Sequence, residues 1–241
     1  MLNICPDGGT GIRARLKIVS LWDVGSIPTP GTAKTMPKNI IIFDFDGVVI
    51  DSFDVTLEVQ KILNPKITAG VYRKGFENNI LDWQNEIGES NSIDKEMAKF
   101  FKISAPMILE RVKFFDGMRD VVDSLHEKYP LYIVTSNNTA LLKEYLHKHD
   151  FDNRFIKILG NDVHKCKAEK IKKIMEENEN DTNYLMITDT LGDMKEAAKV
   201  NVPTIGVTWG YHQKEVLEQG DTYALVDTPE ELVEMISKYF N

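Results

Sequence analysis

Short apolar runs alternate with amphipathic stretches along most of the chain. Runs this short and this apolar are typical of strands buried on both faces of a parallel sheet. The stretches between them place apolar residues three and four positions apart, which is typical of helices that pack on one side. The predicted strands are residues 40–43, 131–135, 156–159, 184–188, 203–208 and 223–226.

The predicted helices follow the strands in regular alternation. Met118, Val121, Val122 and Leu125 show the helical spacing most clearly, and residues 229–240 form a closing helix. Strands that alternate with helices build parallel sheets through right-handed crossovers. The pattern therefore predicts an α/β fold, with a Rossmann-like parallel sheet and helices on both faces.

Residues 52–115 interrupt this alternation because they contain no strand-like run. They predict a small all-helical cap, inserted directly after the first strand, above the core formed by residues 36–51 and 116–241. A helical excursion without a role in substrate choice is the alternative. Helices are expected around residues 55–63, 80–87, 97–101 and 108–112.

Residues 1–35 differ from the rest of the chain. They are rich in glycine and proline, and they show no sustained apolar period. Residues 25–32 resemble the product of a transfer-RNA gene translated as if it were protein. We expect Met36 to be the natural start and residues 1–35 to be a non-native or disordered extension, with an ordinary disordered tail as the alternative.

The composition is that of a soluble globular protein, with 42% apolar and 27% charged residues. No run approaches the roughly 20 apolar residues of a membrane span. The net charge of −8 argues against nucleic-acid and acidic-membrane partners. Two cysteines, Cys5 and Cys166, form no framework and indicate a reducing, cytoplasmic compartment. The sequence does not indicate an oligomeric state.

Polar residues follow the predicted strands where a parallel sheet would bind a ligand. Asp44 ends the first apolar run, and Asp46 and Gly47 come next. Gly47 allows a sharp turn that brings backbone amides close to an anion. Alone, these three residues would suit a simple turn or a calcium loop as well as they suit a catalytic site.

Three more groups of polar residues lie at the ends of predicted strands or at the start of a predicted helix. Thr135 ends the second strand, and Asp189 follows the fourth, with Asp193 one helical turn later. Lys165 and Lys167 precede a helix. In this order, these positions and the Asp44 stretch resemble the four motifs of the haloacid dehalogenase-like (HAD) phosphohydrolases. The resemblance covers roughly residues 38–240, apart from much of the cap.

The resemblance implies a Mg²⁺-dependent phosphatase, similar to phosphoglycolate phosphatase, that acts on a small phosphorylated metabolite. Asp44 would attack phosphorus and form an aspartyl phosphate. Asp46 would protonate the leaving alcohol and later take a proton from water. Mg²⁺ would bind the Asp44 carboxylate, the Asp46 main-chain carbonyl and Asp189, with Asp193 supporting it directly or through water.

The resemblance also implies a phosphate-binding set. Thr135, the amides of Ser136 and Asn137, the Gly47 turn and a lysine would hold the phosphoryl oxygens. Helix capping is the alternative for residues 135–138, because serine and asparagine are good capping residues.

The lysine of this set is either Lys165 or Lys167. Lys165 resembles a form of the third motif from which two prolines are missing, and Lys167 resembles the form in which the lysine opens the helix directly. Lys167 is favoured. Three nearby lysines are expected on a solvated helix face: Lys170, Lys172 and Lys173.

Thr188 stands where the family usually has glycine before the aspartate. We expect it to narrow the pocket without removing the metal. Residues 207–212 resemble the late loop of phosphoglycolate phosphatase-like members, and we expect Trp209 and His212 to be structural or rim residues.

Two other functions fit part of the pattern. A β-phosphoglucomutase-like mutase shares the nucleophile, the acid–base residue and the helical cap. A non-catalytic phosphoacceptor or binding module would need neither Asp46 nor a cap. Asp46 also argues against dehalogenation, because a halide leaves unprotonated.

Overall fold

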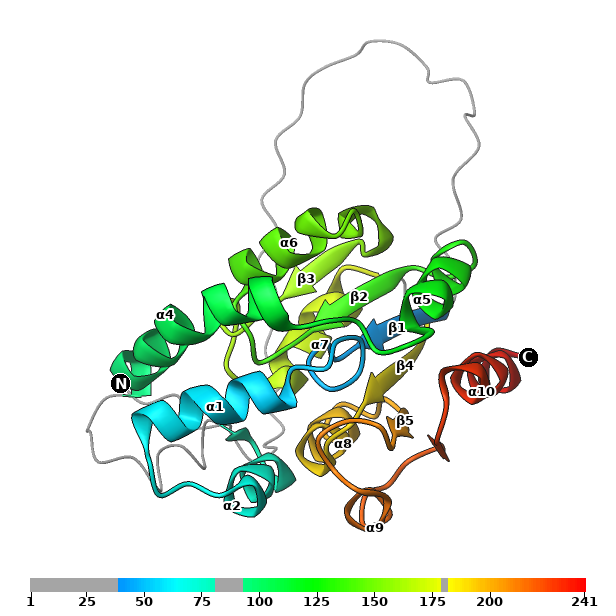
Figure 1. Cartoon of the computed structure of the whole chain (residues 1–241). Coiled ribbons are helices and arrows are strands. Elements are labelled where there is room, and N and C mark those ends of the chain that lie inside the picture. The colour runs from blue at the N-terminus through cyan, green and yellow to red at the C-terminus, as the bar shows by residue number, and fades with distance from the viewer. Residues whose placement is uncertain (1–38, 81–92, 179–181) are drawn as a thin grey trace, which may run out of the picture. The chain divides into compact units, whose positions relative to one another are not determined.

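The computed structural model describes residues 39–80, 93–178 and 182–241 (Figure 1). The predicted extension 1–35, with Cys5, lies outside the described residues, and so does most of the helix expected around 80–87. Within the described residues, no helix is both long enough and apolar enough to span a bilayer.

Six parallel strands form one sheet, which confirms the predicted α/β fold. Each strand ends within one residue of its predicted limits, because a buried apolar run is bounded by the polar residues beside it. The strands are β1 (Asn39–Phe43), β2 (Leu131–Val134), β3 (Lys157–Leu159), β4 (Asn183–Thr188), β5 (Thr204–Val207) and β6 (Ala224–Val226).

The strand order β3-β2-β1-β4-β5-β6 places β1 and β4 at the centre of the sheet. The chain moves outward from β1 to β3 and then returns to the other side of β1. A reversal of this kind opens a crevice at the carboxyl ends of the two central strands. The Asp44 amide donates to the Ile187 carbonyl over 2.9 Å, so the residues that follow β1 and β4 share this edge.

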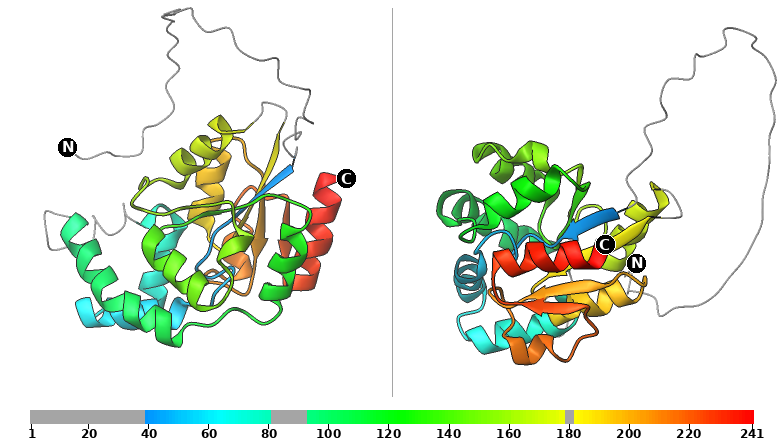
Figure 2. Two further views of the ribbon diagram at one scale, coloured as in Figure 1. Left: turned by 90° about the horizontal axis from the view of Figure 1, so that it is seen from above. Right: turned by 90° about the vertical axis from the view of Figure 1, so that its right-hand side faces the viewer.

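Helices cover both faces of the sheet (Figures 1 and 2). Ile41 and Phe43 of β1 point into one core, and Ile40 and Ile42 point into the other, as the period of a strand requires. The first core is covered by α5 (Met118–His126), α6 (Thr139–Lys148) and α10 (Pro229–Phe240), and the second by α7 (Lys167–Glu176) and α8 (Leu191–Ala198). Two short helices, η2 (Asp152–Arg154) and α9 (Lys214–Leu217), lie in connections.

The described residues of the insertion after β1 form helices, as predicted. They are α1 (Phe53–Leu63), α2 (Ala69–Lys74), η1 (Gly75–Glu77) and α4 (Ile93–Arg111). The expectation of two helices within residues 97–112 is wrong, because α4 continues through Pro106. Pro106 is exposed, so water reaches the carbonyl that loses its amide partner. Arg111 pairs with Glu58 of α1 over 2.7 Å and fastens the end of α4.

Candidate active site

Asp44 lies at the carboxyl end of β1 and is buried. Its Oδ1 accepts a hydrogen bond from the Phe45 amide (2.8 Å), and its Oδ2 lies 2.7 Å from Lys167 Nζ. Burial raises the pKa of Asp44, and the nearby Lys167 charge opposes part of that rise. A carboxylate in this position needs a neighbouring positive charge to stay ionised.

Asp46 is oriented by two donors. The Ser52 hydroxyl donates to Oδ1 (2.7 Å), and the Asn137 side-chain amide donates to Oδ2 (3.2 Å). Burial raises the pKa of Asp46, and these two hydrogen bonds reduce the rise. Gly47 follows with φ +79°, a conformation that favours glycine, and its amide donates to the Ile50 carbonyl.

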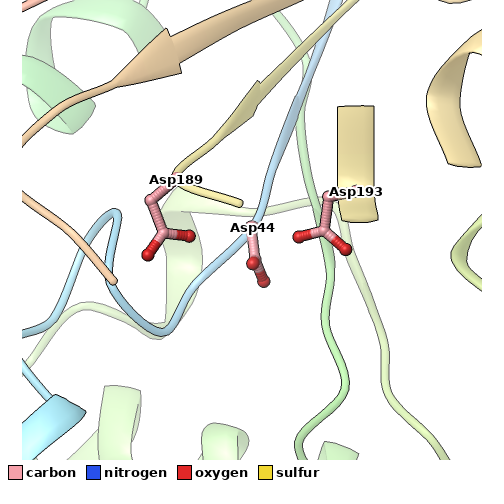
Figure 3. Close-up of side chains that lie close together, drawn as sticks. All are labelled: Asp44, Asp189 and Asp193. Atoms are coloured by element: carbon pink, nitrogen blue, oxygen red, sulfur yellow. The ribbon is translucent and has the colours of Figure 1, made fainter. Parts of the chain in front are cut away.

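Three carboxylates converge from separate elements (Figure 3). Asp44 follows β1, Asp189 follows β4 and Asp193 belongs to α8; each offers an oxygen within 4.8 Å of the others. Asp189 Oδ2 accepts from the Tyr211 amide (2.7 Å), whereas its buried Oδ1 has no hydrogen-bond partner among the described residues. Burial raises the pKa of Asp189 to about 7.

This set of oxygens fits a hard divalent cation such as Mg²⁺. A cation would supply the missing partner of Asp189 Oδ1 and offset the repulsion among the three carboxylates. The Asp46 carboxylate does not belong to this group, and the Asp46 side chain is instead held by Ser52 and Asn137.

Lys167 is the first residue of α7 and is buried between two carboxylates. Its Nζ lies 2.7 Å from Asp44 Oδ2 and 2.6 Å from Asp193 Oδ2. Burial alone would lower the pKa of Lys167, but the two carboxylates raise it above its usual value, so the ammonium stays charged. The Glu196 carboxylate accepts from the Lys167 amide and holds the start of the helix. Lys165 does not line the pocket that contains Lys167.

Thr135, Ser136 and Asn137 follow β2 and line the same pocket. The Thr135 hydroxyl accepts from the Asn137 amide over 3.0 Å. The capping alternative applies to Asn138, whose side chain accepts from two amides in the first turn of α6.

Lys170 does not lie on a solvated face, so that expectation is wrong. Its side chain is fully buried, and Nζ donates to the Thr135 carbonyl over 2.5 Å. Burial, together with the charge of Lys167, lowers the pKa of Lys170 to about 7. The three-residue spacing from Lys167 places both lysines on one face of α7. This spacing is the feature of the sequence that indicates the burial of Lys170 beside Lys167. Lys172 and Lys173 are exposed, as expected.

Tyr211 is a site residue that the sequence analysis does not identify. Its amide donates to Asp189, and its hydroxyl lies 3.1 Å from the Ser52 hydroxyl and 3.0 Å from the Thr56 hydroxyl. Tyr211 therefore connects the metal-ligand candidate to α1. No local pattern indicates this role, because the two partners of the Tyr211 hydroxyl lie more than 150 positions away in the sequence.

Thr188 lies behind the acidic group and does not line the pocket. Its buried hydroxyl donates to Asp193 Oδ2 over 3.0 Å, a contact that glycine cannot make. In the late loop, Trp209 Nε1 donates to the Val48 carbonyl, and His212 Nδ1 accepts from the Leu191 amide.

Many of the site residues line one cavity of about 90 Å³ at the edge of the sheet. Lys167 and Asp193 line it together with the residues that follow β1 and β2, and the insertion after β1 supplies further lining residues. The cavity therefore brings an acidic group, a lysine and several hydroxyl and amide groups to one place.

Comparison with known proteins gives a consistent assignment. The family model of the haloacid dehalogenase-like hydrolases matches residues 41–207. The phosphoglycolate phosphatase of Vibrio parahaemolyticus is 19% identical to this chain, over 82% of this chain and 96% of the relative. That of Colwellia psychrerythraea is 24% identical, over 83% of this chain and 97% of the relative. A crystal structure described as a predicted phosphatase from Clostridium acetobutylicum superimposes with a TM-score of 0.72 at 24% identity, covering 83% of this chain and 99% of that one. Since the family match spans more than half of the sequence, the chain belongs to the haloacid dehalogenase-like hydrolases, as its motifs predict.

Proposed function

We propose that the protein is a Mg²⁺-dependent phosphatase that hydrolyses a small phosphomonoester through an aspartyl phosphate. The observation that carries this proposal is the position of Asp44. Its carboxylate lines the cavity, lies 2.7 Å from the Lys167 ammonium and belongs to the acidic group. A nucleophilic carboxylate needs a nearby positive charge, here the Lys167 ammonium and the proposed cation, to approach a phosphate dianion.

In the first half of the reaction, an Asp44 oxygen forms a bond to phosphorus and the bond to the leaving oxygen breaks. Asp46 donates its proton to that oxygen, and the raised pKa of Asp46 supports this acid role. In the second half, Asp46 takes a proton from water and the water oxygen attacks phosphorus. The bond between phosphorus and the Asp44 oxygen breaks, which releases inorganic phosphate and regenerates the Asp44 carboxylate. Mg²⁺ held by Asp44, Asp189, Asp193 and the Asp46 carbonyl would neutralise charge on the phosphoryl oxygens.

The remaining residues bind the phosphoryl group or enclose it. We propose that Thr135 and Lys167 hold phosphoryl oxygens, with help from the main chain at Ser136, Asn137 and Gly47. Residues 52–115 act as the cap over a core of residues 36–51 and 116–241. A cytoplasmic location stays a prediction. The names of the curated relatives make phosphoglycolate a candidate substrate.

The test is release of inorganic phosphate from a panel of phosphomonoesters with Mg²⁺, including p-nitrophenyl phosphate and phosphoglycolate. Asp44→Asn removes the nucleophile, and we expect a loss of about 10³-fold or more. Asp46→Asn should turn over slowly and still accumulate phosphoenzyme, detected as a mass increase on the peptide that contains Asp44.

Two results would contradict the proposal. Undiminished hydrolysis by Asp44→Asn would show direct attack by water. Isomerisation of sugar phosphates without phosphate release would identify a mutase instead.

A further inference from the structure

The insertion after β1 lines the cavity mainly with apolar and aromatic side chains. Tyr72 of α2 and Phe76 of η1 pack edge to face with ring centroids 5.1 Å apart. Phe100 and Phe101 of α4 pack in the same manner at 5.6 Å. This apolar wall consists of Tyr72, Phe76, Ile80, Met97, Phe100 and Phe101.

The positively charged side chains near this wall do not line the cavity. Arg73 Nε donates to the Tyr211 carbonyl (2.9 Å), and its guanidinium lies over the Phe53 ring, 3.9 Å from the centroid. Lys99 and Lys102, which neighbour Phe100 and Phe101 on α4, are exposed. Among the described residues that line the cavity, Lys167 is the only cation.

The negative charges in the cavity are more numerous. Asp44, Asp46, Asp193 and Glu196 all line it, and Lys167 is the only cationic side chain among the described lining residues. The proposed Mg²⁺ would be matched by Asp44, Asp189, Asp193 and the phosphoryl group, which leaves no positive charge for a second anionic group. Lys167 already contacts Asp44 and Asp193 and is the group that would meet the phosphate. A second anionic group on the substrate would face carboxylates, the apolar wall and neutral groups such as those of Asn78 and Asn79, and it would lose hydration without gaining a cationic partner among the described residues.

The residues that follow Ile80 in the sequence add no positive charge. Residues 81–92, which follow Ile80, contain no lysine, arginine or histidine and include Asp82, Glu86 and Glu89. This part of the chain therefore cannot supply a cation for a second anionic group.

We infer that the enzyme selects phosphomonoesters whose alcohol portion is uncharged and apolar, and that it disfavours substrates with a second anionic group such as phosphoglycolate. This inference rests on the proposed phosphatase activity. It concerns only the part of the substrate beyond the phosphoryl group, which the apolar wall would contact.

The test uses substrate pairs that differ in one charge. Phosphoglycolate is compared with its amide, carbamoylmethyl phosphate, and 4-carboxyphenyl phosphate with 4-carbamoylphenyl phosphate. We expect kcat/KM to be about tenfold or more higher for each amide, because like charges in a partly desolvated site repel strongly. Phenyl phosphate should be turned over at least as well as the aromatic amide.

A variant of the wall tests the cause. Met97→Lys places a cation of similar length in the cavity, and Met97→Gln is the matched uncharged control. We expect Met97→Lys to shift the ratio of carboxylate to amide turnover toward the carboxylate by about tenfold, whereas Met97→Gln leaves that ratio near the wild-type value.

The outcomes separate the two proposals. Equal or faster turnover of the carboxylates by the wild type would overturn the inference and leave the phosphatase intact. An equal shift in both Met97 variants would also overturn it. Failure to release phosphate from every compound, p-nitrophenyl phosphate included, would overturn the proposed function itself.

Discussion

At the scale of single residues, two lysines one helical turn apart on α7 have opposite electrostatic environments. Lys167 contacts two carboxylates, which raise its pKa. Among the described residues, the Lys170 ammonium contacts only the Thr135 carbonyl oxygen, and burial lowers its pKa to about 7. Desolvation disfavours the charge on both, and only Lys167 has anionic partners close enough to compensate.

Replacing Lys167 should therefore abolish most of the activity. We expect Lys167→Ala to lower kcat for p-nitrophenyl phosphate by about 10²–10³-fold, because it removes the cation beside the nucleophile. Lys165→Ala is the matched control, two positions earlier and outside the cavity lining, and should lose less than about threefold. The opposite ranking of the two variants would assign the role to Lys165.

Lys170 should make stability depend on pH. Its pKa is about 7 in the folded state and near 10.5 in the unfolded state, so the unfolded chain binds more protons between these values. The free energy of unfolding then rises with pH across that window. Lys170→Met removes this contribution.

Urea unfolding at pH 7 and pH 9.5 measures the effect. The stability of the wild type relative to Lys170→Met should increase by about 3 kcal/mol between the two pH values. Lys172→Met, at an exposed position of the same helix, should show no such change. A pH-independent difference for Lys170→Met would mean that Lys170 is charged throughout.

At the scale of elements, the insertion after β1 approaches the core closely at the start of α8. A Cβ on Gly192 would collide with the Asn78 carbonyl oxygen and would lie 2.8 Å from the Phe76 carbonyl oxygen. Lys195 of α8 also donates to the Glu77 carbonyl over 2.8 Å. These contacts hold η1 against α8, beside the cavity wall that contains Phe76.

Gly192→Ala should push these elements apart. We expect a loss of about 1–3 kcal/mol in the free energy of unfolding, as for other overpacked sites, and a higher KM. Gly70→Ala is the matched control in α2, because a Cβ there meets nothing within 4 Å. It should be neutral or stabilising by up to about 1 kcal/mol. Similar losses in both variants would show that close approach is not the cause.

At the scale of the whole molecule, the acidic group draws together the ends of β1 and β4 and the start of α8. Burying three carboxylates side by side destabilises the fold unless a cation compensates. A cation that binds only the folded protein stabilises it by mass action. The site that is proposed to serve catalysis therefore also affects global stability.

Mg²⁺ should raise the thermal unfolding temperature relative to EDTA. The stabilisation should reach about 2.7 kcal/mol when Mg²⁺ is at 100 times its dissociation constant. Asp189→Asn should lose most of this response. In EDTA that variant should be at least as stable as the wild type, because it removes a buried carboxylate with an unpartnered oxygen. An unchanged Mg²⁺ response in Asp189→Asn would place the ion elsewhere.

The sequence alone determined the strands and the parallel sheet, and it predicted that Asp44, Thr135, Asp189 and one of two lysines lie at the same edge. These follow from local patterns, since an apolar run predicts a buried strand and its polar end predicts the binding edge. Local patterns could favour Lys167 over Lys165 but could not exclude either. They also misplaced Lys170 and predicted two helices where α4 is a single helix.

Only the tertiary structure decided which groups meet through space. It brought Tyr211 to Asp189, Glu196 to the amide of Lys167, and the apolar wall to the cavity that Asp44 lines. These contacts join segments far apart in the sequence. Periodicity reports only which face of an element is buried, whereas a site depends on what that face is buried against.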